Sequence, residues 1–524
     1  MSNTVRQVAL ATCLGAISLC VFSQKANASA FALREQSADG LGNAFAGETA
    51  KAYDSSTVFF NPAGMAFLKS NEISSTATWI SPDVRFTGQN SNPLYAAGVG
   101  GPNVSGINGP NAIKPAAIGS IFAAYKINSD LSVGFAFDVP FGQRSEYKEN
   151  WVGRYQALAS DITDYEASLV LSYKITDNWS IGGGPRIDYM TGRLSQALNV
   201  SAIGLQVAQG LGSGAQQYAA GAQQAATGAA QAQAAAQAAA AAGNSALAAQ
   251  YAAQAQSLAA QANAAKAQAT ALGAQATAMQ LMAGGWFANG SDGLAKLTGH
   301  DTSVGYTLSS LYKIDEASRI GVSYRSKMFH KLSGSSEEDL PGNAGAAPAA
   351  FTSLFSNQSA SLKVTLPDSA SVGYYRDINS QWAIMADVQW TDWSVIKSLN
   401  VMGASNNLIS STPQNWTNTW SFALGANWKP VERWTFHVGT AYDETPMSDS
   451  NRQARIPDAA RYWAAFGATY DVTRASSVTL GYAHLFTNGG KVTDSSGAAV
   501  GGGVLTGSYQ DSVDIVSATI ALKF

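Results

Sequence analysis

The amino-acid sequence predicts an all-β fold: a 14-stranded antiparallel transmembrane β-barrel with an N-terminal hatch plug and a helical Ala/Gln-rich insertion in an extracellular loop. The composition, a repeated alternation of apolar and polar residues, and an aromatic C-terminal residue support this prediction. The 524 residues include 13% charged residues, 10% aromatic residues and 50 Gly, and the mean hydropathy is -0.04. A helical membrane protein would be far more apolar, whereas strands with one lipid-facing side and one polar side give this balance.

The first 28 residues are typical of a signal peptide. Arg6 precedes an apolar run at 8–22, which is shorter than the ~20 residues that a membrane-spanning helix needs. Ala26-Asn27-Ala28 then supplies the small residues of a cleavage site, so the mature chain is expected to begin at Ser29, with Ala28-x-Ala30 as an alternative site. Export through a signal peptide agrees with a Gram-negative outer-membrane location.

Residues 29–70 are rich in Gly and Ala and show little alternation. We expect this segment to fold into the barrel lumen as a hatch, because a barrel of fourteen strands has room inside and would leak if it were empty. The barrel itself is expected to span residues 71–524.

Segments with period-two alternation recur along the rest of the chain. In the last one, Val516, Ala518, Ile520, Leu522 and Phe524 share a face. Phe524 resembles the C-terminal signal that the outer-membrane assembly machinery reads. The predicted strands are 72–87, 115–127, 131–140, 163–175, 178–194, 302–314, 317–331, 360–376, 381–397, 417–429, 432–443, 461–472, 476–487 and 511–524, an even number as single-chain bacterial barrels have.

The connections alternate between short turns, which we assign to the periplasmic side, and long loops, which we assign to the extracellular side. Tryptophans crowd the strand ends, where an interfacial aromatic girdle is expected, although ordinary packing is the better explanation for about half of them. They are Trp151, Trp179, Trp382, Trp390, Trp393, Trp428, Trp434 and Trp463.

One extracellular loop carries a foreign segment, which we place at 203–298. It is almost entirely Ala and Gln, and Ala is the strongest helix former. We therefore expect a helical hairpin that turns at Gly243-Asn244, with arms of ~50 Å. Three roles stay open for it: a tolerated low-complexity expansion, a surface projection that contacts partners, or a lid that gathers ligand.

Four blocks, in order, resemble the FadL/TodX family of outer-membrane long-chain fatty acid and hydrocarbon transporters. They are FALREQSADGLGNAFAGETAKAYDSSTVFFNPAGM at 31–65, YKENWVGRY at 147–155, LPDSASVGYYRDINSQWAIMADVQWTDWS at 366–394 and DETPMSDSNRQARIPDAARYW at 443–463. The resemblance covers essentially the whole mature chain apart from the insertion. It implies a hatch-plugged barrel that takes up hydrophobic ligands from a loop groove, through an internal site, to a lateral opening at the third strand.

The resemblance also points to individual residues. Phe31 is the expected apolar contact of the internal site, and Asn61, Pro62, Ala63 and Gly64 match the hatch motif, where a structural turn is expected. Pro140 and Gly142 are candidates for the lateral opening, since Pro cannot donate to a strand ladder.

A fatty acid also needs a cation for its carboxylate, because a charge inside a lumen must be paired or solvated. Arg154, Arg193 and Arg325 are the candidate ligand-binding cations, and each fits a structural charge network as well. The segment NWTNTWS at 415–421 lacks the basic residue that the family comparison suggests there, so the ligand can also be an uncharged aromatic hydrocarbon.

Other classes of function find less support. Among four His there is neither a metal-ligand spacing nor an accompanying Gly-x-Ser-x-Gly elbow, and Cys13 and Cys20 both fall in the leader, so we expect no enzyme, cofactor or metal. A net charge of -3 gives no electrostatic case for nucleic acid. A general porin would need an open lumen, and an adhesin would rely on the insertion. We expect a monomer surrounded by outer-membrane lipid and lipopolysaccharide.

Overall fold

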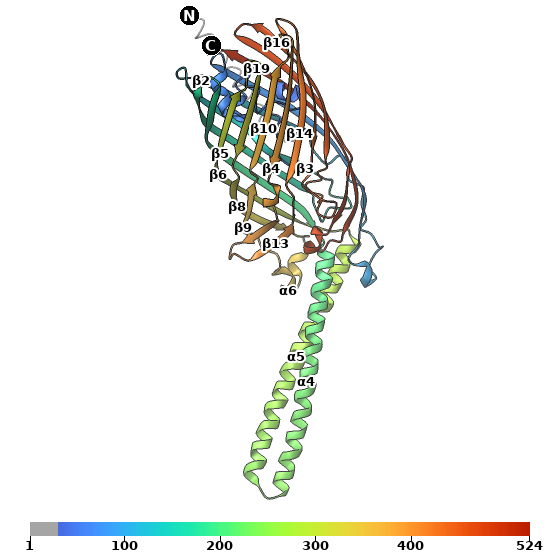
Figure 1. Ribbon diagram of the computed structural model, residues 1–524. Helices are drawn as coiled ribbons and strands as arrows, with labels where there is room; N and C mark the ends of the chain where they lie inside the picture. The colour runs from blue at the N-terminus through green and yellow to red at the C-terminus, as the bar shows by residue number, and fades with distance from the viewer. Residues whose placement is uncertain (1–29) are drawn as a thin grey trace, which may run out of the picture.

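The computed structural model describes residues 30–524, so the expected signal peptide at 1–28 lies outside the described residues. The chain forms one closed antiparallel barrel of tilted strands, with short helices inside it and a long helical hairpin projecting from one end (Figure 1). The fold predicted from the sequence is confirmed.

Within residues 30–524 the sheet has 19 strands. They are β1 (Glu72–Asn90), β2 (Ala116–Lys126), β3 (Leu131–Glu146), β4 (Ala159–Thr176), β5 (Trp179–Leu198), β6 (Gly293–Lys313), β7 (Ser318–Arg325), β8 (Met328–Asp339), β9 (Gln358–Leu366), β10 (Ser369–Asp377), β11 (Trp382–Thr391), β12 (Ser398–Gly403), β13 (Leu408–Pro413), β14 (Thr419–Val431), β15 (Trp434–Asp443), β16 (Arg461–Thr473), β17 (Ser476–Thr487), β18 (Gly490–Asp494) and β19 (Leu505–Lys523).

These strands make a barrel of 14 because several are pieces of one longer strand. β7 and β8 are pieces of one strand, because both pair with β6. β9 and β10 are pieces of the next strand, because β9 pairs with β8 and β10 pairs with β7. In the same way, β11 and β12 are pieces of one strand and β13 and β14 are pieces of the next, because β11 pairs with β14 and β12 pairs with β13. β17 and β18 are also pieces of one strand, because both pair with β19. β1 pairs with β19 along its whole length and closes the cylinder.

Every predicted strand is present, but several begin or end further toward the long-loop end than the sequence indicated. β6 starts at Gly293 rather than 302, and β5 runs to Leu198 rather than 194. The ladder between these two strands is unbroken from Trp179 to Leu198. The barrel wall therefore extends well beyond the most apolar stretches on which the sequence assignment relied.

The outer surface of the barrel is apolar. Large side chains such as Val304, Leu424 and Phe466 point outward and are more than half exposed. The girdle prediction holds for the exposed Trp179, Trp382, Trp428 and Trp434 at strand ends. Trp151, Trp393 and Trp463 follow the alternative of ordinary packing, since they are buried and pack on the hatch or on the loops.

The hatch fills the lumen near the short-turn end. It contains the helices α2 (Ala38–Gly42) and α3 (Thr57–Phe60) and the 3₁₀ helix η1 (Pro62–Phe67), and α2 lies against β15, β16, β17 and β19. The hatch backbone approaches the wall at glycines. A Cβ on Gly439 would collide with the backbone of Asn43, and one on Gly321 would collide with the carbonyl of Thr49.

The insertion is a helical hairpin as predicted, and its helices are α4 (Val200–Ala241) and α5 (Ser245–Ala288) (Figure 1). Asn199 and Asn244 cap the two N-termini by accepting hydrogen bonds from the backbone amides of Ala202 and Leu247. Gly243 makes the turn with φ +79°. None of the described helices is long and apolar enough to cross a membrane.

Short helical segments complete the loops at the hairpin end and beside it. They are η2 (Tyr95–Ala97), η3 (Ala344–Ala346), α6 (Ala349–Thr352), η4 (Trp393–Val395) and η5 (Ser496–Val500). The base of the hairpin packs on this layer through Met279, Trp286 and Phe351, which are almost fully buried. The indole of Trp286 donates a 2.7 Å hydrogen bond to the side chain of Asn343.

Candidate functional site

An apolar cavity lies inside the barrel, between the hatch and the extracellular loops. About 880 Å³ of space lies between its lining residues, and part of this space is open to solvent. The strands contribute alternate, inward-facing residues, as period two requires. Its walls are mostly aliphatic, with Ile162 on β4, Met190 and Leu194 on β5, Leu297 on β6 and Leu332 on β8.

Phe31 forms part of this cavity's lining and is 3% exposed. Its ring centroid lies 5.1 Å from that of Trp393, 5.6 Å from that of Phe141 and 6.0 Å from that of Trp416. Tilted and edge-on contacts of this kind stabilise aromatic clusters beyond their burial. Phe31 therefore belongs to the wall of the apolar cavity, and its contact with a ligand stays a prediction.

The chain segment around Phe31 fills a break in the barrel wall. β2 pairs with β3 only as far as the Ile121–Phe137 pair. Beyond it, the backbone amide of Leu33 donates to the carbonyl of Pro140 at 2.7 Å, and the amide of Gly142 donates to the carbonyl of Phe31 at 2.8 Å. The register of β3 with β4 also shifts between Asp138 and Phe141. Pro140 and Gly142 therefore lie where β3 leaves β2 and pairs with the N-terminal segment instead.

A second cavity lies closer to the hairpin and borders the first, with about 1120 Å³ of space that is partly open to solvent. Ile203 at the base of α4, Phe355 after α6, and Val401 on β12 form part of its apolar lining. Six residues line both cavities: Leu194, Leu297, Leu362, Leu399, Gln453 and Arg455. The two cavities are therefore direct neighbours, one nearer the loops and one nearer the hatch.

Arg455 is the cation at the junction of the two cavities. Its guanidinium donates to the side chain of Gln196 and to the carbonyl of Ser195 at 3.3 Å. No carboxylate of residues 30–524 lies within ion-pair distance of it. Burial lowers the pKa of Arg455 to about 10, so the side chain is still positively charged at neutral pH.

The three arginines proposed from the sequence lie elsewhere. Arg325 faces the lumen but forms a 2.7 Å ion pair with Glu166 and lines a separate, deeper cavity. Arg154 forms a 2.7 Å ion pair with Asp292 near the hairpin. Arg193 points outward and is exposed, because the inward-facing residues of this part of β5 are its neighbours Gly192 and Leu194. None of the three lines the apolar cavity.

The hatch motif forms a rigid turn. The Asn61 side chain donates to the carbonyl of Thr49 at 2.6 Å and accepts from the amide of Ala63 at 3.1 Å. Pro62 begins η1, and the carbonyl of Ala63 accepts from Ser172 and Ser180 in the wall. A Cβ on Gly64 would collide with Thr57. In this structure the motif anchors the hatch to the wall.

Arg455 was missed by the sequence reasoning, although it belongs to the block at 443–463. Three arginines occur in that block, and their spacing does not show which one is free. Arg452 pairs with Asp449, and Arg461 pairs with Asp458. Only the folded loop reveals that Arg455 is the one of the three that has no carboxylate partner among the described residues.

Comparisons with known proteins agree with this architecture. Residues 19–524 match the family model described as outer membrane protein transport protein (OMPP1/FadL/TodX). The long-chain fatty acid transport protein of Escherichia coli O6:H1 is 24% identical, over 92% of this chain and 93% of its own length. A putative outer membrane protein of Neisseria meningitidis serogroup B is 26% identical, over 94% of both chains.

Solved structures share the fold. A FadL homologue of Pseudomonas aeruginosa superimposes with a TM-score of 0.72 at 24% identity, covering 94% of this chain and 99% of that one. The toluene transporter TodX of Pseudomonas putida superimposes with a TM-score of 0.56 at 15% identity, covering 95% of this chain and 100% of that one.

Proposed function

Because this chain belongs to the OMPP1/FadL/TodX family of outer membrane transport proteins of Gram-negative bacteria, we propose that it takes up long-chain fatty acids passively through its plugged barrel. The proposal concerns the ligand class and the route. Transport of a hydrophobic compound is the activity of the family as a whole.

The observation that carries the proposal is the position of Arg455. A fatty acid combines one carboxylate with one long apolar chain. The Arg455 guanidinium, which has no carboxylate partner among the described residues, lies between an apolar inner cavity and a mixed outer cavity that also includes Lys296 and Glu338. A carboxylate can accept two hydrogen bonds from the planar guanidinium while the chain extends along the aliphatic wall. Desolvating the carboxylate would otherwise be costly, so Arg455 sets where the head group rests.

The inner cavity accommodates the tail. With the head group held at Arg455, the tail is expected to point into the inner cavity toward Phe31, whose ring forms part of the lining. The tail therefore leads as the ligand moves from the outer cavity into the inner one, and the head group stops at Arg455.

We propose that the exit is lateral, between β2 and β3. The N-terminal segment holds this break with the two backbone hydrogen bonds at Pro140 and Gly142. Backbone bonds of this kind contribute about 1 kcal/mol each, so the ligand can displace the segment without an energy source. The ligand would then enter the outer-membrane bilayer through the gap.

The test is uptake of labelled oleate by cells that lack their own fatty acid transporter and express either the wild-type chain or Arg455→Gln. Arg193→Gln is the matched control, because Arg193 is exposed on the outer face. We expect Arg455→Gln to lower uptake about tenfold at limiting oleate, the loss expected for one charge-assisted hydrogen bond, and Arg193→Gln to leave it unchanged. Equal uptake by both variants, with equal barrel in the outer membrane, would overturn the role of Arg455.

Aromatic hydrocarbons are the second candidate ligands, because Phe31, Phe141, Trp393 and Trp416 present a cluster of rings beside the cavity. Toluene uptake distinguishes the two candidates. A wild-type chain that carries toluene but not oleate, with no effect of Arg455→Gln, would establish an uncharged ligand.

A further inference from the structure

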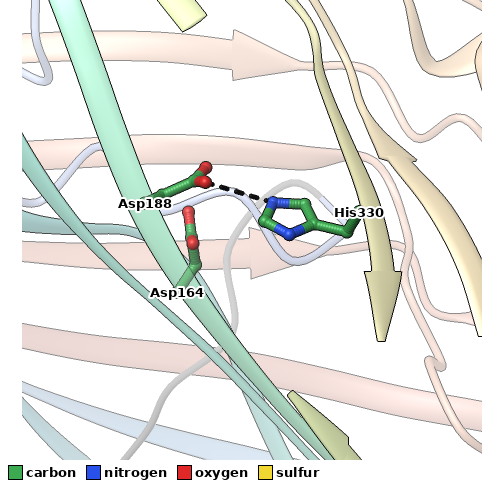
Figure 2. Close-up of side chains that lie close together, drawn as sticks. All are labelled: Asp164, Asp188 and His330. Carbon is green, nitrogen blue, oxygen red and sulfur yellow. Dashed lines mark ion pairs between the residues drawn. The ribbon is translucent and has the colours of Figure 1, made fainter. Parts of the chain in front are cut away.

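Three side chains with metal-binding atoms converge inside the barrel wall. Asp164 comes from β4, Asp188 from β5 and His330 from β8, and their ligand atoms all lie within 4.8 Å of one another. Figure 2 shows the two carboxylates and the imidazole ring turned toward a common space, with Asp188 and His330 joined by a dashed line. Their exposed fractions are 0%, 1% and 3%.

These buried groups lack ordinary partners. Among the described residues, neither carboxylate oxygen of Asp164 or of Asp188 has a hydrogen-bond partner, and neither does either ring nitrogen of His330. The His330 Nε2 atom lies 3.2 Å from Asp188 Oδ1, and its Nδ1 atom lies 3.3 Å from Asp301 Oδ2. Buried polar atoms of native proteins are almost always satisfied, so these atoms, gathered in one place, have the character of a cation site.

The charge balance of the surrounding wall points the same way. Asp138, Glu166 and Asp188 are direct cross-strand partners on β3, β4 and β5, so three carboxylates form one row of the ladder. Like charges that face each other across strands are destabilising. Two arginines lie within reach, Arg186 and Arg325, and both are bound to Glu166.

We propose that Asp164, Asp188 and His330 bind one divalent transition-metal ion of the Zn²⁺ type. An imidazole nitrogen with two carboxylate oxygens suits zinc, whereas Ca²⁺ and Mg²⁺ prefer sites made of oxygen alone. Water completes the coordination. The carboxylate of Asp301 lies 3.3 Å from the second ring nitrogen of His330, and in the metal-bound state it would accept a hydrogen bond there and fix the ring orientation, as partners of metal-bound histidines commonly do.

Such an ion would join parts of the wall that the ladder does not join directly. β5 and β8 are separated by β6, which pairs with both. The site also lies at the floor of the apolar cavity, because Ile162, Met190 and Leu332 line the cavity and each has a ligand residue two positions away on its own strand. The ion would stabilise the folded barrel and neutralise that floor.

The metal site stands independently of the proposed ligand, and its test needs no uptake measurement. The full chain, folded in detergent and dialysed against EDTA, is titrated with Zn²⁺ alone by calorimetry and with Co²⁺ alone by visible absorption. We expect one ion per chain and a Zn²⁺-dependent rise in the unfolding temperature. Asp164→Asn, Asp188→Asn and His330→Gln should each weaken binding by at least tenfold, and Asp301→Asn by about tenfold or more.

His484→Gln is the matched control, because His484 forms a 2.8 Å pair with Asp514 on the exposed surface. It should bind Zn²⁺ like the wild type. Heat-modifiable migration in gels shows that each variant is folded, and the wild-type titration decides the question even where a variant does not fold. A wild-type chain that binds neither Zn²⁺ nor Co²⁺, or an His330→Gln variant that binds like His484→Gln, would overturn the site and leave the transport proposal untouched.

Discussion

Ala32 and Phe141 face each other as an isolated antiparallel bridge between the N-terminal segment and β3. The flanking hydrogen bonds, from Leu33 to Pro140 and from Gly142 to Phe31, make this a non-hydrogen-bonded pair. The Cα atoms of such a pair lie about 4.5 Å apart, close enough for a disulfide. The bridge is therefore a place where the proposed lateral gate can be locked.

Ala32→Cys combined with Phe141→Cys should close the gate when oxidised. The two cysteines of the sequence, Cys13 and Cys20, lie in the predicted signal peptide. We expect oleate uptake to fall to background after oxidation and to recover after reduction. Each single cysteine variant controls for the loss of the native side chain. Unchanged uptake by chains shown to be crosslinked would refute an exit at this position.

Filling the inner cavity should shorten the ligands that it accepts. Gly192 lines the cavity, and a Cβ there would lie 3.4 Å from Leu332, an ordinary contact distance. Gly192→Leu should therefore fold and project into the cavity, weakening oleate binding tenfold or more (about 1.4 kcal/mol) while affecting octanoate much less. Gly210→Leu on the hairpin, where a Cβ meets nothing within 4 Å, is the control. Competition binding with fatty acids of graded length measures the effect.

A side chain on a wall glycine that the hatch backbone touches should displace the hatch. A side chain at Gly439 would collide with the backbone of Asn43, so Gly439→Val should shift the hatch and open a path for ions. Single-channel conductance in planar bilayers should rise above that of the wild type. Val438→Leu, on the outward face of the same strand, should not change it. If the conductance of Gly439→Val equals that of the wild type, the hatch tolerates the added side chain without opening a path for ions.

The distal part of the hairpin should be dispensable for transport. Gly214 faces Leu272 and Gly228 faces Leu258, so the two helices pack mainly on each other there. Replacing residues 219–267 with the native turn Ala242-Gly243-Asn244-Ser245 keeps the base that lines the outer cavity. We expect oleate uptake within about twofold of the wild type, because the lining residue Ile203 is retained. A large loss would instead assign the projection a role in gathering ligand.

Glu35 should make the hatch sensitive to pH. Burial raises the pKa of Glu35 to about 7 from 4.5. Since the folded-state pKa is raised, this group's contribution to stability is complete below about 4.5 and is lost as the pH rises through about 7. The titration of Glu35 should therefore lower the free energy of unfolding of the wild type by up to roughly 3 kcal/mol between pH 5 and pH 8.

The measurement is the unfolding temperature of wild type and Glu35→Gln at both pH values. Glu35→Gln should show a smaller decrease from pH 5 to pH 8 than the wild type. Glu149→Gln, at an exposed loop position, should behave like the wild type. Parallel decreases in all three chains would show that other groups govern the pH dependence.

The sequence by itself determined the class of fold, because the evidence for it is local. A period of two, the short turns and the aromatic terminus are each readable within a few residues, and they give the strand number, the hatch and the helical hairpin correctly. Alternation also places Arg325 inside the barrel. Arg193 was misplaced because it was assigned by its position at a strand end, whereas the alternation through Gly192 and Leu194 turns it outward.

Only the tertiary structure decided which of these side chains meet. Arg325 and Glu166 are 159 positions apart, and they pair because closing the sheet brings β4 and β7 to face one lumen. Arg455 is singled out from Arg452 and Arg461 only after those two have found carboxylates in the folded loop. Asp164, Asp188 and His330 likewise share no spacing that a sequence could reveal. Periodicity fixes the face of a strand on which a residue lies, whereas register and barrel closure fix its neighbours, and those are properties of the whole chain.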